Sequence, residues 1–196
     1  MTAIAGLIYA GGGSTRFGAN KAEASLQGRR LIEHVAERLE PQVNMLAVAG
    51  PVRLTGADNL GDGAHAGKGP LAGLLAGLRW ASDLPDTKWL VTTPCDVPLL
   101  PKNLVSSLSK SLTDTPTVLN VDGRWQAGCA LWPTGADRFI EDALDKGEDL
   151  SLHRALRSLN VDAIETSQEA LDGSFLNINT QDELLRLEQR LAQSHG

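Results

Sequence analysis

The chain has 196 residues, which is enough for one well-buried domain and short for two. Its 42% hydrophobic and 21% charged residues are ordinary for a globular protein and exclude a disordered or collagen-like chain. Two cysteines, Cys95 and Cys129, exclude a disulfide framework and a four-cysteine metal site, and they favour a reducing compartment. The net charge of −6 argues against a surface that coats nucleic acid.

The N-terminus has the pattern of a buried strand rather than of a targeting signal. Residues 4–9 are apolar, but no Lys or Arg precedes them and glycines follow them. A signal peptide needs a positive start and a longer apolar stretch. No window approaches the roughly 18 uninterrupted apolar residues of a membrane span. The sequence therefore predicts a cytoplasmic protein with neither a membrane nor a nucleic-acid partner.

Short apolar runs alternate with helical patterns, which is typical of a mostly parallel α/β sheet covered by helices on both faces. In chain order, the expected elements of the first half are a strand at 4–9, a helix at 30–39, a strand at 45–49, a helix at 69–82 with Pro70 in its first turn, a strand at 89–93 and a helix at 104–112.

The second half shows weaker patterns. Its expected elements are a hairpin of strands 117–121 and 127–132 around Asp122-Gly123, helices at 136–144 and 150–159, a strand at 175–180, and a last helix to about Gln193. Thr180 is the predicted N-cap of that helix, with Glu183 completing a capping box. Because no repeat or linker interrupts these elements, we expect a single domain over residues 1–196.

The densest signal is the glycine loop at residues 10–21, Ala-Gly-Gly-Gly-Ser-Thr-Arg-Phe-Gly-Ala-Asn-Lys. Glycines let backbone N–H groups approach a ligand closely, and a row of N–H groups cradles phosphate. Arg16 supplies a fork for two phosphate oxygens, and Lys21 supplies a mobile charge. The spacing matches neither a Walker A loop nor a dinucleotide fingerprint. Its place after the first buried strand favours a phosphate site over a flexible turn.

A second signal is Asp96, which follows the strand at 89–93 between Pro94 and Pro98. A carboxylate at that strand end lies on the same edge of the sheet as the glycine loop, so it is placed to hold Mg²⁺ against a triphosphate. The structural alternative is a cap for the helix that starts near Pro101. Cys95 is expected to be a small packed residue rather than a nucleophile or a metal ligand.

Four segments together resemble a known family. Residues 10–21 resemble the loop of nucleotide-sugar-type nucleotidyltransferases and, more closely, that of molybdenum cofactor guanylyltransferases, which attach GMP to molybdopterin. The Gly-Gly-x-Ser form of the loop and the terminal Asn-x-Asn-Thr favour this guanylyl branch. The other three matching segments are Gly69-Pro70-Leu71-Ala72-Gly73, Pro94-Cys95-Asp96-Val97-Pro98-Leu99 and Asn177-Ile178-Asn179-Thr180. The family usually has Leu where Tyr9 stands here.

The resemblance implies a Rossmann-like fold with GTP along the strand ends, Mg²⁺ as cofactor, a molybdopterin acceptor, and molybdoenzyme maturation proteins as partners. Nucleotide contacts are expected from Tyr9, Ala10, Gly11, Gly12, Lys21, Asp62, Gly69, Pro70, Gly73 and Asp96. The expected catalytic residues are Arg16, Lys21 and Asp96, of which Asp96 binds the metal. Asn177 and Asn179 are expected on the acceptor or metal side.

We therefore predict that the terminal phosphate of molybdopterin attacks the α-phosphorus of GTP and expels pyrophosphate. An acceptor phosphate is already ionised near pH 7, so alignment and charge neutralisation replace a general base. One alternative is a related cytidylyl- or sugar-phosphate nucleotidyltransferase. The other, from a different class, is a nucleotide-binding module without turnover.

Overall fold

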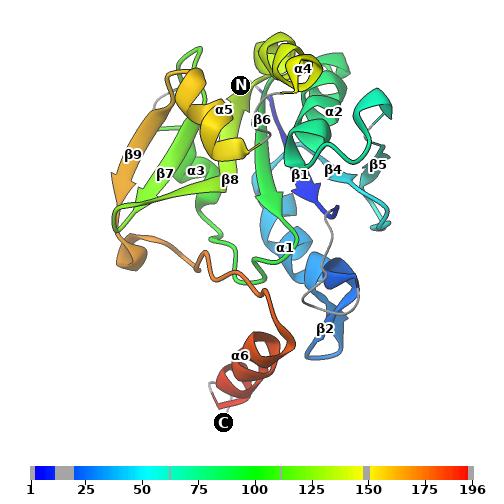
Figure 1. Ribbon diagram of the computed structural model, residues 1–196. Helices are drawn as coiled ribbons and strands as arrows, with labels where there is room; N and C mark the ends of the chain where they lie inside the picture. Colours follow the sequence, from blue (N-terminus) through cyan, green and yellow to red (C-terminus); the bar gives the residue numbers. More distant parts are fainter. Residues whose placement is uncertain (1–2, 12–19, 62, 111, 148–150, 194–196) are drawn as a thin grey trace.

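The computed structural model describes residues 3–11, 20–61, 63–110, 112–147 and 151–193. A seven-stranded sheet of order β5-β4-β1-β6-β8-β7-β9 runs through these residues (Figure 1). The strands are β1 (Ala3–Tyr9), β4 (Met45–Ala49), β5 (Asp58–Leu60), β6 (Thr87–Pro94), β7 (Thr117–Val121), β8 (Arg124–Pro133) and β9 (Asp162–Thr166). Every pairing is parallel except those of β8 with β6 and β7. The predicted mostly parallel sheet and the 117–132 hairpin are confirmed.

Helices cover both faces of the sheet, as predicted. Helices α1 (Leu31–Leu39) and α3 (Leu104–Leu108) pack into the apolar cluster on one face. Helices α2 (Pro70–Asp83), α4 (Asp137–Lys146) and α5 (Leu152–Ser158) pack into the cluster on the other. Successive side chains of a strand face opposite sides, so Ile8 of β1 joins the first cluster and Leu7 the second. This double burial explains why the strands are continuous apolar runs in the sequence.

A third, smaller cluster joins the C-terminal helix α6 (Gln181–Gln193) to a two-stranded hairpin, β2 (Ser25–Leu26) and β3 (Arg29–Arg30). Its buried members are Leu26, Leu31, Ile178 and Leu187. Figure 1 shows α6 standing apart from the sheet, below it and to the left of the hairpin. The sequence did not predict this hairpin, because its turn residues Gln27 and Gly28, both at positive φ, are not the usual Asn-Gly pair.

The predicted strand at 175–180 is wrong. This segment belongs to neither sheet and instead follows the loop after β6, through the bonds Ser174 N to Leu99 O (2.7 Å) and Ile178 N to Asp96 O (2.9 Å). The alternation of apolar and polar residues in this segment has another cause than strand pairing. Ile178 packs into the third cluster, and its polar neighbours do not. We call residues 171–180 the C-terminal strap.

Other boundaries differ in smaller ways. The helix predicted at 104–112 ends at Leu108, and β5 and β9 are short strands that the sequence patterns did not predict. The capping box of α6 is confirmed, since Glu183 N donates to Thr180 Oγ1 and Thr180 N donates to the Glu183 carboxylate. Within the part of the chain that is described, no helix has the length and apolarity to cross a membrane.

Candidate active site

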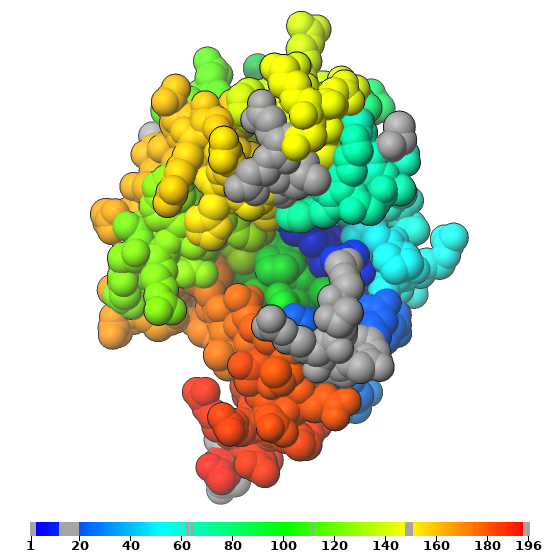
Figure 2. All heavy atoms as spheres, viewed as in Figure 1, coloured from blue at the N-terminus to red at the C-terminus, as the bar shows by residue number. Residues whose placement is uncertain are grey.

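A pocket of about 370 Å³ opens at the carboxyl ends of β1 and β6. Figure 2 shows the surface hollowed where the end of β1 (dark blue) and the segment after β6 (green) meet the C-terminal strap (orange). The lining residues come from the start of the glycine loop, its far end, the first turn of α2, the segment after β6, β8 and α5. They are Tyr9, Ala10, Gly11, Asn20, Lys21, Ala22, Pro70, Pro94, Cys95, Asp96, Gly128 and Leu152.

Backbone hydrogen bonds fix the point where β1 ends and the glycine loop begins. Cys95 N donates to Tyr9 O at 3.0 Å, and Ala10 N donates to Ala49 O at 2.8 Å. Gly50 lies so close behind this junction that a Cβ atom there would stand 2.7 Å from the Ala10 carbonyl carbon and from Gly11 N. Its φ of +132° is also one that other residues rarely adopt. The start of the loop is therefore held rigidly by its neighbouring strands.

The far end of the loop is set by a short 3-10 helix, η1 (Lys21–Glu23). The Asn20 side chain caps it by accepting from Ala22 N at 3.2 Å, which points Lys21 into the site. The Lys21 ammonium donates to Asp96 Oδ2 at 2.8 Å and to Asn179 Oδ1 at 3.0 Å. Three residues that are distant in the sequence thus meet at one charged centre.

Asp96 keeps an unused oxygen. Its Oδ1 atom is buried and has no hydrogen-bond partner within the described structure, although a buried carboxylate oxygen normally has one. No group of three or more His, Cys, Asp or Glu side chains forms a metal site among the residues that can be described. Such a single carboxylate with a nearby amide oxygen suits a hard cation like Mg²⁺, which takes few protein ligands and completes its shell with water and phosphate.

The titratable groups around Asp96 limit what the site can do. Burial, with a further contribution from the charge of Asp96, raises the pKa of Cys95 to about 12. Burial raises the pKa of Cys129 to about 12 as well, and it also raises the pKa of Tyr9. Because the thiolate is the nucleophilic form, neither cysteine can attack a phosphorus atom near neutral pH.

The structure brings together most of the predicted site residues that can be seen. Tyr9, Ala10, Gly11, Lys21, Pro70 and Asp96 line the pocket, and Gly69, with φ of 74°, is the N-cap of α2 beside it. Asn179 joins through Lys21, whereas Asn177 is exposed and is not part of the lining. Gly12, Arg16 and Asp62 lie outside the described residues.

Gly73 lies differently from its expected position. It packs behind the pocket, where an added Cβ atom would stand 3.1 Å from the Ala49 Cβ and 3.4 Å from the Tyr9 ring. It is not one of the lining residues. A larger side chain at this position would therefore press on β1 and β4 before it reached a bound base.

Sequence patterns missed several residues that build the site: Asn20, Ala22, Gly50, Gly128 and Leu152. For Gly50 a signal was present, since it directly follows the predicted strand at 45–49, at the edge where the glycine loop also begins. For Leu152 there was none, because only the packing of α5 against the sheet brings it near β6.

Comparison with known proteins identifies the family of the chain. The family model of the MobA-like NTP transferase domain matches residues 6–164. The molybdenum cofactor guanylyltransferase of Cereibacter sphaeroides is 37% identical over 190 residues, covering 95% of this chain and 96% of that protein. The enzyme of the same name from Acidiphilium cryptum is 34% identical over 184 residues, covering 91% and 90%.

Solved structures share the fold. Molybdopterin-guanine dinucleotide biosynthesis protein A from Archaeoglobus fulgidus superposes with a TM-score of 0.75 at 24% identity, over 96% of this chain and 99% of that one. A 4-diphosphocytidyl-2C-methyl-D-erythritol synthase from Anaerococcus prevotii superposes at 0.70 with 9% identity, over 97% and 96%. The fold alone therefore does not select the base. With the family model and the sequence relatives in agreement, the chain belongs to the MobA-like NTP transferase family and is a nucleotidyltransferase.

Proposed function

We propose that this chain transfers GMP from GTP to the terminal phosphate of molybdopterin and releases pyrophosphate, a step of molybdenum cofactor biosynthesis. The sequence relatives that match nearly the whole chain are guanylyltransferases by name. The observation that carries the proposal is the Lys21 ammonium on the Asp96 carboxylate, at the strand ends where the glycine loop meets the pocket. Cation and carboxylate are the two charge types that a metal-dependent transfer between phosphates requires.

The reaction is a single displacement. An oxygen of the acceptor phosphate forms a bond to the α-phosphorus of GTP, and the bond from that phosphorus to the bridging oxygen breaks, so pyrophosphate leaves with the electron pair. Near pH 7 the acceptor is already an anion, and no proton has to be removed from it. Cys95 and Cys129 remain thiols and so are not nucleophiles here; in this scheme the acceptor phosphate attacks directly, and the protein works by alignment and electrostatics.

Lys21 has two positions in this scheme. In the structure its ammonium is engaged by Asp96 and Asn179. When GTP binds, the same ammonium moves to the phosphates, where it stabilises the charge of departing pyrophosphate together with Arg16. The long unbranched lysine side chain suits this movement, because it holds a point charge on four rotatable carbons.

A divalent cation, Mg²⁺ in our proposal, suits the Asp96 and Asn179 oxygens once the Lys21 ammonium has moved away from them. Asp96, with its unpartnered Oδ1, and the Asn179 amide oxygen are the residues that would hold the cation. Bound there, the metal supplies neutralisation of phosphate charge, a contribution of several kcal/mol to the transition state. Asn177 and the segment around Gly128 are left for the acceptor side.

The guanine base is assigned to the turn that begins α2. Gly69 and Pro70 present bare backbone at this turn, which leaves room for a flat base beside it. The free N–H groups of the first turn of α2 also favour phosphate nearby. Gly73 supports the site from behind by letting α2 pack closely on Tyr9 and Ala49.

Pyrophosphate release tests the proposal. The full chain is incubated with Mg²⁺, a molybdopterin acceptor and GTP, ATP or CTP in turn, and the pyrophosphate is assayed. We expect release with GTP that depends on the acceptor. Release with CTP alone would support the related cytidylyl reaction instead, and nucleotide binding without any release would identify a binding module. We further propose a cytoplasmic location and molybdoenzyme maturation proteins as partners.

A further inference from the structure

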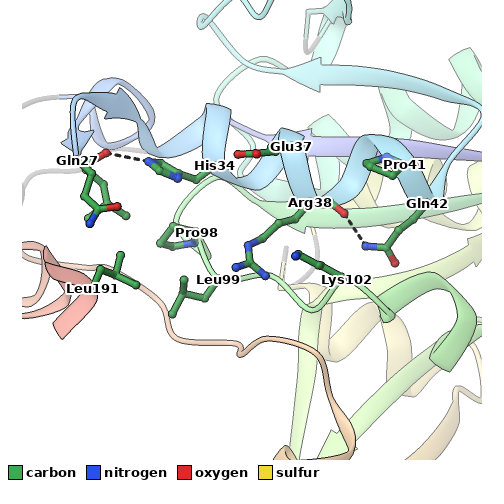
Figure 3. Close-up of a pocket in the computed structure, with 11 residues that line it drawn as sticks. Gln27, His34, Glu37, Arg38, Pro41, Gln42, Pro98, Leu99, Lys102 and Leu191 are labelled. Atoms are coloured by element: carbon green, nitrogen blue, oxygen red, sulfur yellow. Dashed lines mark hydrogen bonds between the residues drawn. The ribbon is translucent and has the colours of Figure 1, made fainter. Parts of the chain in front are cut away.

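A second pocket, of about 490 Å³, lies between α1, the loop after β6 and α6 (Figure 3). It shares no lining residue with the candidate active site. Its lining combines apolar and polar side chains: Leu26, Gln27, His34, Glu37, Arg38, Pro41, Gln42, Pro98, Leu99, Lys102 and Leu191. We call it the α1–α6 pocket. Its volume is in the range of sites that hold small organic ligands.

Two cationic groups face this pocket with spare hydrogen-bond donors. Arg38 is half-buried and uses one donor, its Nη1, on the Leu100 carbonyl at 3.2 Å. Lys102 makes no side-chain hydrogen bond to any described residue, and no described carboxylate lies within ion-pair distance of either cation. Figure 3 shows the two side chains extending toward one another.

The other polar groups of the pocket are already engaged. The Glu37 carboxylate, the one acid in the lining, pairs with Arg29 at 2.6 Å. The Gln42 side chain donates to Arg38 O and Pro101 O and accepts from Val105 N. These bonds hold the backbone around the pocket together and leave the amide few groups for a ligand. The His34 Nε2 bonds to Leu26 O at 2.8 Å. Unused positive charge therefore gathers at Arg38 and Lys102.

Apolar side chains form the rest of the wall. Leu26 and Leu99 belong to or pack on the third cluster, and Pro41, Pro98 and Leu191 complete the surface. A ligand that fills this pocket thus needs an anionic end and an apolar body. Two adjacent cations match a dianion better than a single charge, and a phosphate monoester carries close to two negative charges at neutral pH.

We propose that the α1–α6 pocket is a second binding site, which takes a small phosphate monoester with an apolar body. Its phosphate binds between Arg38 and Lys102, and its apolar part covers Leu99 and Leu191. This inference does not depend on the identity of the nucleotide that the enzyme uses.

Titration calorimetry with phenyl phosphate tests the inference on the full chain in phosphate-free buffer. Benzoate and benzyl alcohol serve as a monoanion and a neutral ligand of similar shape. We expect saturable binding of phenyl phosphate, at least tenfold weaker binding of benzoate, and no binding of benzyl alcohol. Benzoate binding as tight as that of phenyl phosphate would overturn the preference for a phosphate, and the absence of saturable binding would overturn the site.

Variants locate the binding. Lys102→Gln should weaken phenyl phosphate about tenfold, because one lost charge-assisted contact is worth roughly that factor; this side chain has no described partner, so its loss does not disturb the fold. Lys88→Gln, an exposed lysine outside both pockets, is the matched control and should bind as the parent does. If Lys21→Gln abolishes binding while Lys102→Gln leaves it unchanged, the probe occupies the active site and the proposal is wrong.

Discussion

In the candidate active site the Lys21 ammonium lies 2.8 Å from the Asp96 carboxylate, whereas in the α1–α6 pocket no described carboxylate lies within ion-pair distance of Arg38 or Lys102. The first arrangement is neutral in itself, so a charged ligand must exchange partners with groups already engaged. The second is an unpaired positive surface that an anion can join directly. In this molecule the ion pair therefore lies where the proposed chemistry needs both charge types, and the unpaired positive charge lies where we propose that an anion binds.

The largest effect should come from the acidic half of that ion pair. We predict that Asp96→Ala lowers turnover by a hundredfold or more while the fold survives, since a metal contributes several kcal/mol to the transition state and each ~1.4 kcal/mol is a factor of ten. Steady-state rates measure the turnover, and a circular dichroism spectrum shows whether the fold survives. A folded variant with activity within tenfold of the parent would remove Asp96 from the mechanism.

The basic half should show a different pattern. We predict that Lys21→Ala and Arg16→Ala reduce turnover more than they reduce GMP binding, by about tenfold or more in rate, because both side chains act on phosphates beyond the first. Single-turnover rates and GMP and GTP titrations separate the two quantities. Equal loss of GMP and GTP affinity with an unchanged rate per bound complex would contradict the assignment.

If the Lys21 ammonium and a metal ion compete for the same oxygens, Lys21 should affect metal binding even when no nucleotide is present. Since its ammonium occupies Asp96 Oδ2 and Asn179 Oδ1, replacing it by Met should raise the affinity for Mn²⁺, used as a probe cation, by severalfold. Calorimetry on the nucleotide-free chain measures this. Unchanged or weaker Mn²⁺ binding would mean that lysine and metal do not compete for the same oxygens.

Gly50 links the fold to the active site. Gly50→Ala is predicted to cost about 2–4 kcal/mol of unfolding free energy, since the added carbon meets backbone at a strained φ. Thermal unfolding checks it, with Gly56→Ala as the matched control: Gly56 is also at positive φ, at +84°, but has nothing within 4 Å of an added Cβ. Equal losses of unfolding free energy in the two variants would mean that the positive φ alone, and not the close backbone contact at Gly50, causes the cost.

The smallest effect is expected at Cys95, although it lines the pocket. Burial raises its pKa to about 12, so at pH 7 to 9, far below that value, the group is a neutral thiol and adds no step to the rate profile. We predict that Cys95→Ala keeps turnover within about threefold of the parent. A loss of more than tenfold, or a rate limb between pH 7 and 9 that disappears in the variant, would show a part for this thiol.

The sequence predicts features that depend on neighbouring residues better than features that depend on contacts between distant parts of the chain. Leu7, Ile8 and the capping box at Thr180 follow from local pattern, and the structure confirms them. The pattern of residues 175–180 predicts a strand that does not form, because the one buried residue in this stretch, Ile178, gives the same alternation as a strand in a sheet. Asp96 and Lys21 were singled out separately, but their direct contact and the third member, Asn179, depend on packing across 75 and 158 residues.

The most direct test of the central claim is kcat/KM for GTP, ATP and CTP with a molybdopterin acceptor and Mg²⁺. A site that pairs with the polar edge of its base rejects a wrong base by up to roughly 10⁴–10⁵, because buried polar groups are otherwise left unpaired. We predict a strong preference for GTP, with one pyrophosphate released per guanylylated acceptor. Equal use of CTP or ATP would contradict the guanylyl assignment and leave only the wider nucleotidyltransferase activity.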